Sequence, residues 1–253
     1  MRFLLMLFLM LIAVNTATAN NLVNIIAQNK PSVVGIGVYT PTGRPQNSIQ
    51  GTGFVIGNGQ FVVTNYHVIS SELDDATLQE RVIYVGSGPR AEKRKVTLVA
   101  NSKKHDLAVL KISGASLPAL KLASDVFISE GSEVAFTGFP IGAVLGLYPV
   151  THRGIIARVT PTVTPVDDSR QISIQMLKRM RDPYMVYQLD ATAYPGNSGS
   201  ALYEIESGQV VGIINKVFVQ QTKEGVISNP SGITYAIPVK YLLELLNQQN
   251  IAF

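Results

Sequence analysis

A long series of short runs rich in β-branched and aromatic residues, separated by glycine, proline and asparagine, most constrains the fold of this chain. Runs of this length and spacing are typical of an all-β sandwich or barrel. Helical spacing of apolar residues is clear only near the end, over residues 240–249. We therefore predict an all-β protein with one closing helix. The predicted strands are 33–39, 53–56, 60–64, 82–85, 96–100, 108–112, 133–138, 154–159, 185–190, 200–203, 210–215 and 233–237.

The first residues follow a different pattern. A single basic residue, Arg2, precedes an unbroken apolar run over residues 3–14, and small and polar residues then lead to Ala17-Thr-Ala19. This order is typical of a secretory signal peptide. The apolar run is shorter than the roughly 20 residues that a helix needs to cross a bilayer. We predict a signal peptide at 1–19 and a mature domain at 20–253 with no stable membrane anchor; an uncleaved anchor is the alternative.

Composition narrows the class of protein. With 46% hydrophobic and 15% charged residues, the chain is globular rather than disordered or a coiled coil. There are 21 basic and 17 acidic residues and no dense basic run, so we expect no nucleic-acid partner. The absence of cysteine excludes disulfides, thiolate metal sites and a cysteine nucleophile.

Ser198 is the first candidate for a catalytic residue. It lies in the segment Pro-Gly-Asn-Ser-Gly-Ser (195–200), shortly after a predicted strand. A serine hydroxyl is a poor nucleophile until a neighbouring base takes its proton. The flanking glycines allow a sharp turn that can aim successive N–H groups at one spot and so stabilise an oxyanion. Taken alone, however, the segment is better explained as a tight turn, because turns favour these residues for conformational reasons.

Three histidines could supply the base. His67 lies at a strand-to-loop junction, where a side chain can be positioned for function. We expect His105 and His152, which lie in basic segments, to be solvated surface imidazoles. Asp106 comes immediately before a predicted buried strand. Its carboxylate could stabilise one tautomer of a catalytic histidine, or the residue could simply form a turn at the end of the strand.

The three residues occur in the chain order His67, Asp106, Ser198, which is the order of the chymotrypsin arrangement and not that of subtilisin or the α/β-hydrolases. Four segments carry a wider resemblance. They are Gly-Thr-Gly-Phe-Val-Ile (51–56), Val-Thr-Asn-Tyr-His-Val (63–68), His-Asp-Leu-Ala-Val-Leu-Lys-Ile (105–112) and Pro-Gly-Asn-Ser-Gly-Ser (195–200). Together they resemble the protease domain of the HtrA (Deg) family of trypsin-like serine peptidases, over most of the chain that follows the leader.

The resemblance implies a fold of two six-stranded antiparallel β-barrels with a C-terminal helix. On this mapping the N-terminal barrel covers about residues 30–120, the C-terminal barrel about 130–238, and the helix 239–249. A helix in this place agrees with the apolar spacing noted above.

The resemblance also implies roles for particular residues. His67 would be general base and then general acid, Asp106 would orient it, and Ser198 would attack the peptide carbonyl. The backbone N–H groups of Gly196 and Ser198 would form the oxyanion hole, with Asn197 holding the turn between them. No metal and no cofactor is expected.

The resemblance bears on substrate preference only through the residues that it assigns to the primary specificity pocket. The mapping places Thr192 at the base of the primary specificity pocket and Ile213, Ile214 and Asn215 along one wall. Neither Thr192 nor Ile214 offers a buried carboxylate. We therefore expect cleavage after small or medium aliphatic residues rather than after Lys or Arg.

Three departures from the family are visible. The 55 residues after Ser198 are taken up by the predicted last strands and helix, so we expect a protease domain without a PDZ domain. Ser200 stands where the family usually has a second glycine. Residues 160–183 are predicted to form an unusually long surface loop, either a solvated excursion or a contributor to gating or substrate contact. These departures leave open the activation mechanism and whether the protein is a homo-oligomer.

The sequence thus favours an exported serine endopeptidase, periplasmic or secreted in a bacterium, that acts on proteins or peptides in quality control or processing. The alternative is a catalytically silent trypsin-like module that binds unfolded or partner proteins. A β-barrel without any site does not explain why four separated segments match one catalytic pattern.

Overall fold

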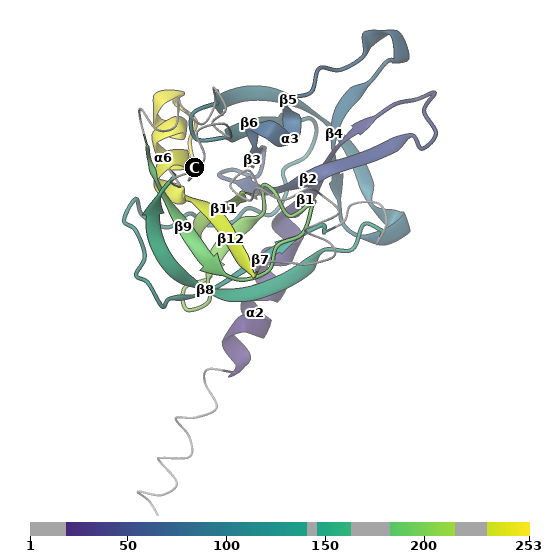
Figure 1. Ribbon diagram of the computed structural model, residues 1–253. Coiled ribbons are helices and arrows are strands. Elements are labelled where there is room, and N and C mark those ends of the chain that lie inside the picture. Colours follow the sequence, from purple (N-terminus) through teal and green to yellow (C-terminus); the bar gives the residue numbers. More distant parts are fainter. Residues whose placement is uncertain (1–18, 141–145, 163–182, 216–231) are drawn as a thin grey trace, which may run out of the picture.

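The computed structural model describes residues 19–140, 146–162, 183–215 and 232–253, which form two β-barrels side by side (Figure 1). Each barrel is closed and has six strands, and every strand pair within it is antiparallel. The predicted fold class is therefore confirmed. Residues 1–18, which carry nearly all of the predicted signal peptide, lie outside the described residues.

The strands of the first barrel are adjacent in the order β1-β2-β3-β6-β5-β4, and those of the second in the order β10-β11-β12-β9-β8-β7. The first barrel consists of β1 (Val33–Tyr39), β2 (Asn47–Ile56), β3 (Phe61–Asn65), β4 (Glu80–Val85), β5 (Glu92–Ser102) and β6 (Leu107–Ile112). The second consists of β7 (Glu133–Gly138), β8 (Val150–Pro161), β9 (Met185–Asp190), β10 (Ala201–Glu204), β11 (Val210–Asn215) and β12 (Ile233–Pro238).

Every predicted strand corresponds to one of these, but β2, β5 and β8 are longer than the sequence indicated. Their additional residues are mostly exposed or half-buried and polar, so they carry no apolar signal. Their backbones are paired nonetheless. For the same reason β8 continues to Pro161, beyond the predicted start of the long loop at residue 160; residues 163–182 of that loop lie outside the described residues.

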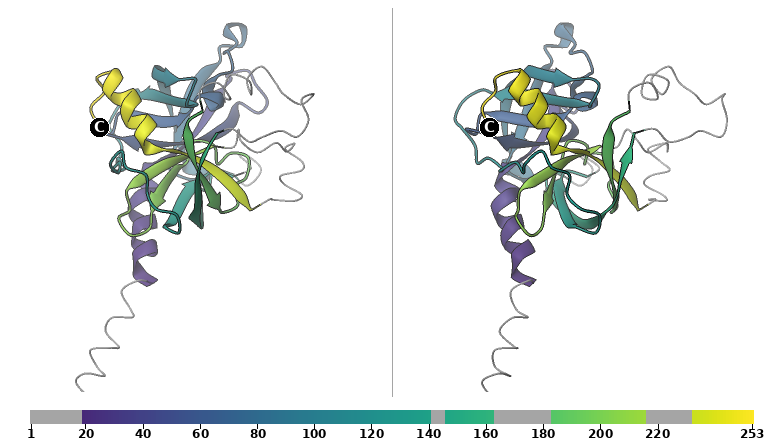
Figure 2. Two further views of the ribbon diagram at one scale, coloured as in Figure 1. Left: turned by 60° about the vertical axis from the view of Figure 1, so that its left-hand side comes forward. Right: turned by 90° about the vertical axis from the view of Figure 1, so that its left-hand side faces the viewer.

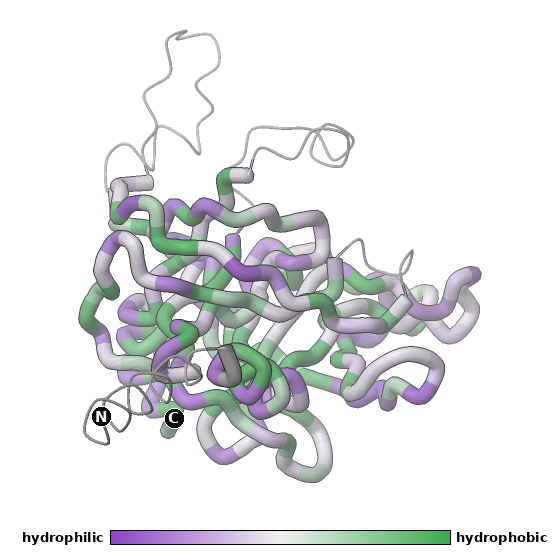
Figure 3. Tube along the Cα trace, turned by 90° about the horizontal axis from the view of Figure 1, so that it is seen from below, coloured by the Kyte–Doolittle hydropathy of each residue, from purple (hydrophilic) through white to green (hydrophobic). Residues whose placement is uncertain are grey.

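The buried apolar side chains form one core inside each barrel, a third core between the barrels and a small fourth cluster where Ile25 packs against the second barrel. The first four residues of β6 are all apolar for a structural reason: Ala108 and Leu110 point into the first barrel, whereas Leu107 and Val109 point into the core between the barrels. Alternation with a period of two therefore buries both faces of the strand. Seen from below, hydrophobic and hydrophilic residues alternate along much of the chain (Figure 3).

The helix α6 (Val239–Gln248) closes the core between the barrels. It contacts β5 of the first barrel and β11 and β12 of the second. Leu242, Leu245 and Leu246 are buried in the shared core. Figure 2 shows the helix alongside both barrels. The predicted C-terminal helix is confirmed, and its apolar face joins the two halves of the molecule.

An N-terminal helix, α2 (Ala19–Asn29), is attached to the second barrel although β1, which follows it, belongs to the first. The side-chain amide of Asn21 donates to the carbonyl of Ile205 at 2.8 Å, and that of Asn29 to the carbonyl of Gly208 at 3.1 Å. The other helices in the described part of the chain are the single turn α3 (Tyr66–Ile69) and the 3-10 turns Lys30–Ser32, Asp75–Thr77 and Gly88–Arg90. No helix in the described ranges is both long and apolar enough to cross a membrane.

Candidate active site

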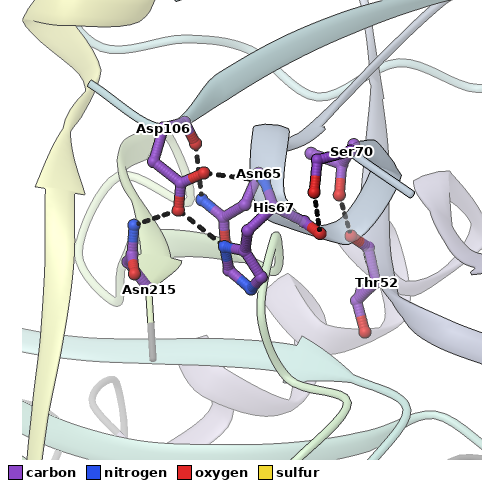
Figure 4. A network of polar contacts seen from close by, with 7 residues as sticks. Thr52, Asn65, His67, Ser70, Asp106 and Asn215 are labelled. Atoms are coloured by element: carbon purple, nitrogen blue, oxygen red, sulfur yellow. Dashed lines mark hydrogen bonds and ion pairs between the residues drawn. The ribbon is translucent and has the colours of Figure 1, made fainter. Parts of the chain in front are cut away.

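His67 and Asp106 face each other at the ends of two paired strands. His67 lies in α3, directly after β3, and Asp106 directly precedes β6, which pairs with β3. Nδ1 of His67 is 2.6 Å from Oδ2 of Asp106, and the backbone N–H of His67 donates to Oδ1 at 2.8 Å (Figure 4). In a neutral imidazole, a carboxylate at Nδ1 favours the tautomer in which this nitrogen carries the proton and Nε2 is the acceptor.

Asp106 is itself held firmly. Its backbone has φ 53, a left-handed conformation that aspartate tolerates better than most residues. Its carbonyl accepts from the backbone N–H of Tyr66 at 3.0 Å and from the side chain of the buried Asn65 at 3.1 Å. The amide of Asn215 donates to Oδ2 at 2.8 Å. The carboxylate is thus fixed in position from both barrels.

Asn215 was expected along a pocket wall, but the structure turns its buried side-chain amide toward Asp106 (Figure 4). Ile213 is buried in the core between the barrels and Ile214 in the core of the second barrel. Thr192 is half-buried in the loop after β9. The side chains of the two isoleucines are therefore directed into the core, and contact with a ligand would fall to their backbone.

Two consecutive β-turns, 194–197 and 197–200, share Asn197, and Ser198 is the second residue of the second turn. The N–H of Asn197 donates to the carbonyl of Tyr194, and the N–H of Ser200 to that of Asn197, each at 3.0 Å. Gly196, with φ 100, and Gly199, with φ 88, occupy the third positions of these turns. A positive φ at the third position is the mark of a type II turn and favours glycine there. The glycines flanking Ser198 are thus required by the backbone conformation.

The turns around Ser198 are fastened to both barrels. The carbonyl of Ser198 accepts from the N–H of Thr52 in β2, and the N–H of Gly199 donates to the carbonyl of Ile214 in β11, both at 2.9 Å. A Cβ on Gly51 would lie 3.0 Å from the carbonyl oxygen of Ser198 and 2.8 Å from the methyl groups of Val68. The serine turn, residues 194–200, and α3, which carries His67, therefore both approach β2 at Gly51.

Two N–H groups at this turn are left unused by the protein. Within the described ranges, the N–H groups of Gly196 and Ser198 have no protein acceptor, whereas those of Asn197, Gly199 and Ser200 all donate. The carboxamide of Asn197, expected to hold the turn, is buried and has no described hydrogen-bond partner; its backbone makes the turn bonds instead. The described hydrogen bonds include none between Ser198 Oγ and His67.

The expectation for the other two histidines was wrong. His105 stacks on Tyr241 with ring centroids 4.4 Å apart and meets the edge of Tyr184 at 4.8 Å. His152 stacks on Phe136 at 5.0 Å, its Nε2 is buried, and burial lowers the pKa of its imidazole. Charged neighbours in the sequence therefore concealed two packed imidazoles. His152 lies in β8, where alternate residues face opposite sides, and His105 lies in the turn between β5 and β6.

Sequence reasoning missed Asn65 and Thr52 as parts of this site. Each stands inside a segment that carried the family resemblance, which was the one signal available for them. Among the described residues, no group of three or more His, Cys, Asp and Glu side chains could hold a metal ion.

The two barrels, with a His–Asp pair and a glycine-flanked serine at their junction, define a class of protein. Residues 51–213 match the family model of the trypsin-like peptidase domain, and the chain belongs to this family.

Its curated relatives are serine endoproteases of the HtrA/DegP type. Two are named "Probable periplasmic serine endoprotease DegP-like". That of Marinomonas sp. is 30% identical over 214 residues, covering 84% of this chain and 38% of the relative. That of Halomonas elongata is 29% identical over 199 residues, covering 78% of this chain and 34% of the relative. The resemblance to HtrA proteins is confirmed. The chain spans between about a third and two-fifths of the length of these relatives.

Solved structures share the fold. The active form of the Rv3671c protease from M. tuberculosis superposes with a TM-score of 0.66 at 22% identity, covering 94% of this chain and 88% of that chain. The serine endoprotease from Yersinia pestis gives a TM-score of 0.63 at 22% identity, covering 90% of this chain and 66% of that chain.

Proposed function

We propose that this protein is an exported serine endopeptidase that hydrolyses peptide bonds of proteins or peptides with His67, Asp106 and Ser198. The observation that carries the proposal is the 2.6 Å contact between His67 Nδ1 and Asp106 Oδ2. It leaves Nε2 of the imidazole as the basic nitrogen. The turn that bears Ser198 is bonded to the same strand, β2, against which α3 packs.

The reaction divides into acylation and deacylation. His67 Nε2 takes the proton of Ser198 as Oγ attacks the carbonyl carbon of the substrate, and Asp106 stabilises the imidazolium that forms. The unused N–H groups of Gly196 and Ser198 bind the oxyanion of the tetrahedral intermediate. The imidazolium then gives its proton to the leaving amine. Water attacks the acyl-enzyme by the same route, which releases the acid and restores Ser198.

The proposed substrate preference rests on Thr192 at the base of the primary pocket. Its half-buried hydroxyl supplies no negative charge to attract Lys or Arg. Cleavage after Val, Ala or Ile in a peptide library is the expected result. Dominant cleavage after Lys or Arg would refute this assignment of the pocket.

Export is proposed from the leader pattern at residues 1–19, and the relatives' names place those proteins in the periplasm. By analogy, protein quality control or processing outside the cytoplasm is the proposed setting. N-terminal sequencing of the protein recovered from the periplasm or medium would test this, with Asn20 as the expected first residue.

A silent binding module is the second candidate. It is favoured by one observation, that the described hydrogen bonds include none from Ser198 Oγ to His67. A triad that closes only when substrate binds would look the same, because catalytic hydrogen bonds often tighten in the substrate complex.

Labelling with a fluorophosphonate separates the two candidates. An activated serine reacts with the probe, and mass spectrometry then identifies the modified residue. We expect labelling at Ser198 that is lost in His67→Ala and retained in the matched histidine control His105→Phe, which preserves the ring contacts with Tyr241. If Ser198 stays unlabelled with and without a peptide substrate, the silent module is the correct function.

A further inference from the structure

Thr52 is a fully buried residue of β2 in the first barrel that is bonded twice to the serine turn of the second barrel. Its hydroxyl donates to the carbonyl of Gly196 at 2.7 Å, and its backbone N–H donates to the carbonyl of Ser198 at 2.9 Å. No other residue described in the structure gives a hydrogen bond to both carbonyls.

The direction of the hydroxyl is fixed by its partners. Oγ1 accepts from the backbone N–H of Phe139 at 3.0 Å, immediately after β7. A backbone N–H can only donate and a carbonyl can only accept, so the hydroxyl proton must point to Gly196. The carbonyl of Thr52 accepts from the hydroxyl of Thr64 at 2.7 Å. Every polar group of Thr52 is therefore engaged in a site with no exposed surface.

These bonds fix two peptide planes of the turn at both ends. In the peptide between Gly196 and Asn197, the carbonyl is held by Thr52 and the N–H by Tyr194. In the peptide between Ser198 and Gly199, the carbonyl is held by Thr52 and the N–H by Ile214. A peptide plane held at its oxygen and its nitrogen cannot rotate without breaking a bond.

The two unused N–H groups belong to the peptides that adjoin these fixed planes. The N–H of Ser198 lies in the peptide between the two planes, and that of Gly196 lies in the peptide before the first. Donors that bind a developing oxyanion are effective because their direction is set before the reaction and needs no reorganisation during it. The two hydrogen bonds from Thr52 therefore restrict the direction in which the N–H groups of Gly196 and Ser198 point.

We infer that Thr52 is a positioning residue that sets the direction of the Gly196 and Ser198 N–H groups from the opposite barrel. The inference rests on the proposed function, since those groups matter only if Ser198 is acylated. It also gives the contact between the barrels a catalytic consequence, because the two donors depend on a hydroxyl that belongs to the other barrel.

The test compares three variants. Thr52→Val keeps the shape of the side chain and removes the hydroxyl, whereas Thr52→Ser keeps the hydroxyl and removes a methyl group. Thr137→Val is the matched control: Thr137 is also buried, and its hydroxyl makes two bonds, to Thr151 at 2.8 Å and Tyr203 at 2.9 Å. Those bonds lie in the second barrel and involve no atom of the serine turn.

The measurements are kcat and KM on a peptide substrate, the inhibition constant of a peptide boronate that matches this substrate, and thermal stability. Loss of one whole oxyanion donor lowers kcat about 10²–10³-fold in known cases, so misdirection of the donors should lower it by about 10- to 100-fold in Thr52→Val. We expect KM to change by less than about twofold and boronate affinity to fall in step with kcat/KM. Thr52→Ser should recover most of the loss, and Thr137→Val should lose stability with little change in kcat.

The outcomes are distinguishable. If the wild type is labelled at Ser198 but Thr52→Val and Thr137→Val lose activity only in proportion to their loss of stability, Thr52 is a purely structural residue and the inference is overturned. An unchanged kcat in Thr52→Val has the same meaning. If the wild-type protein is itself not labelled, the proposed function fails and this inference falls with it.

Discussion

The side-chain amide of Asn215, at the end of a strand in the second barrel, donates at 2.8 Å to the carboxylate of Asp106 in the first barrel. The same oxygen, Oδ2, also accepts from the imidazole of His67. The orientation of the proposed base is thus set by residues from both barrels, so a change in how the barrels pack would alter the imidazole as well as the serine turn.

Removing this amide should lower activity. A hydrogen bond to a charged group is worth about 1.5–3 kcal/mol, so we expect kcat of Asn215→Ala to fall about 10- to 100-fold. Asn215→Asp should fall further, because it replaces a donor by a like charge beside Asp106. Asn29→Ala is the control, since the side-chain amide of the buried Asn29 also donates a hydrogen bond, but to the backbone carbonyl of Gly208, away from the site. An Asn215→Ala enzyme as active as this control would contradict the prediction.

Acid should destabilise the protein through His152. Burial lowers the pKa of this imidazole below 6.5, so the unfolded state takes up its proton more readily than the folded state. The destabilisation caused by this group is therefore absent above about pH 6.5 and grows as the pH drops toward the lowered pKa. His152→Phe keeps a ring against Phe136 but does not titrate. Its melting temperature should fall less than that of the wild type between pH 7 and pH 5; parallel falls would show that other groups are responsible.

Gly138 and Ser200 should depend on each other. A Cβ on Gly138 would overlap the Ser200 hydroxyl and would lie 2.8 Å from Oδ1 of Asn197. Gly138→Ala should therefore displace the serine turn and lower kcat. Adding Ser200→Gly removes the main clash, so the double variant should be more active than Gly138→Ala alone. Purely additive losses in this double-mutant cycle would argue against direct contact.

The core between the barrels should depend on α6. Leu246 is fully buried there, and replacing such a leucine with alanine costs about 2–5 kcal/mol of unfolding free energy. Leu243 lies on the same helix but is only partly buried, so Leu243→Ala should cost less. Urea denaturation measures both. Equal losses would show that α6 does not close the core as the packing indicates.

The sequence alone determined the strands whose apolar residues face a core, because burial imposes a period of two that can be read directly. From the sequence we also predict His67, Asp106 and Ser198 as the catalytic residues, on the basis of their residue types, their chain order and the family resemblance. The polar extensions of β2, β5 and β8 carried no such signal, because their backbones pair without any need for apolar side chains.

Contacts between residues far apart in the chain were decided only by the tertiary structure. Asn215 lies 109 residues from Asp106, and Thr52 lies 144 residues from Gly196. No local pattern records that an asparagine will orient a carboxylate, or that a threonine of one barrel will fix the turn of the other. His105 and His152 look solvated beside charged neighbours and become packed only when the barrels close. Local burial leaves a periodic trace in the sequence, whereas the partner of a buried polar group is fixed by how the barrels fold and pack.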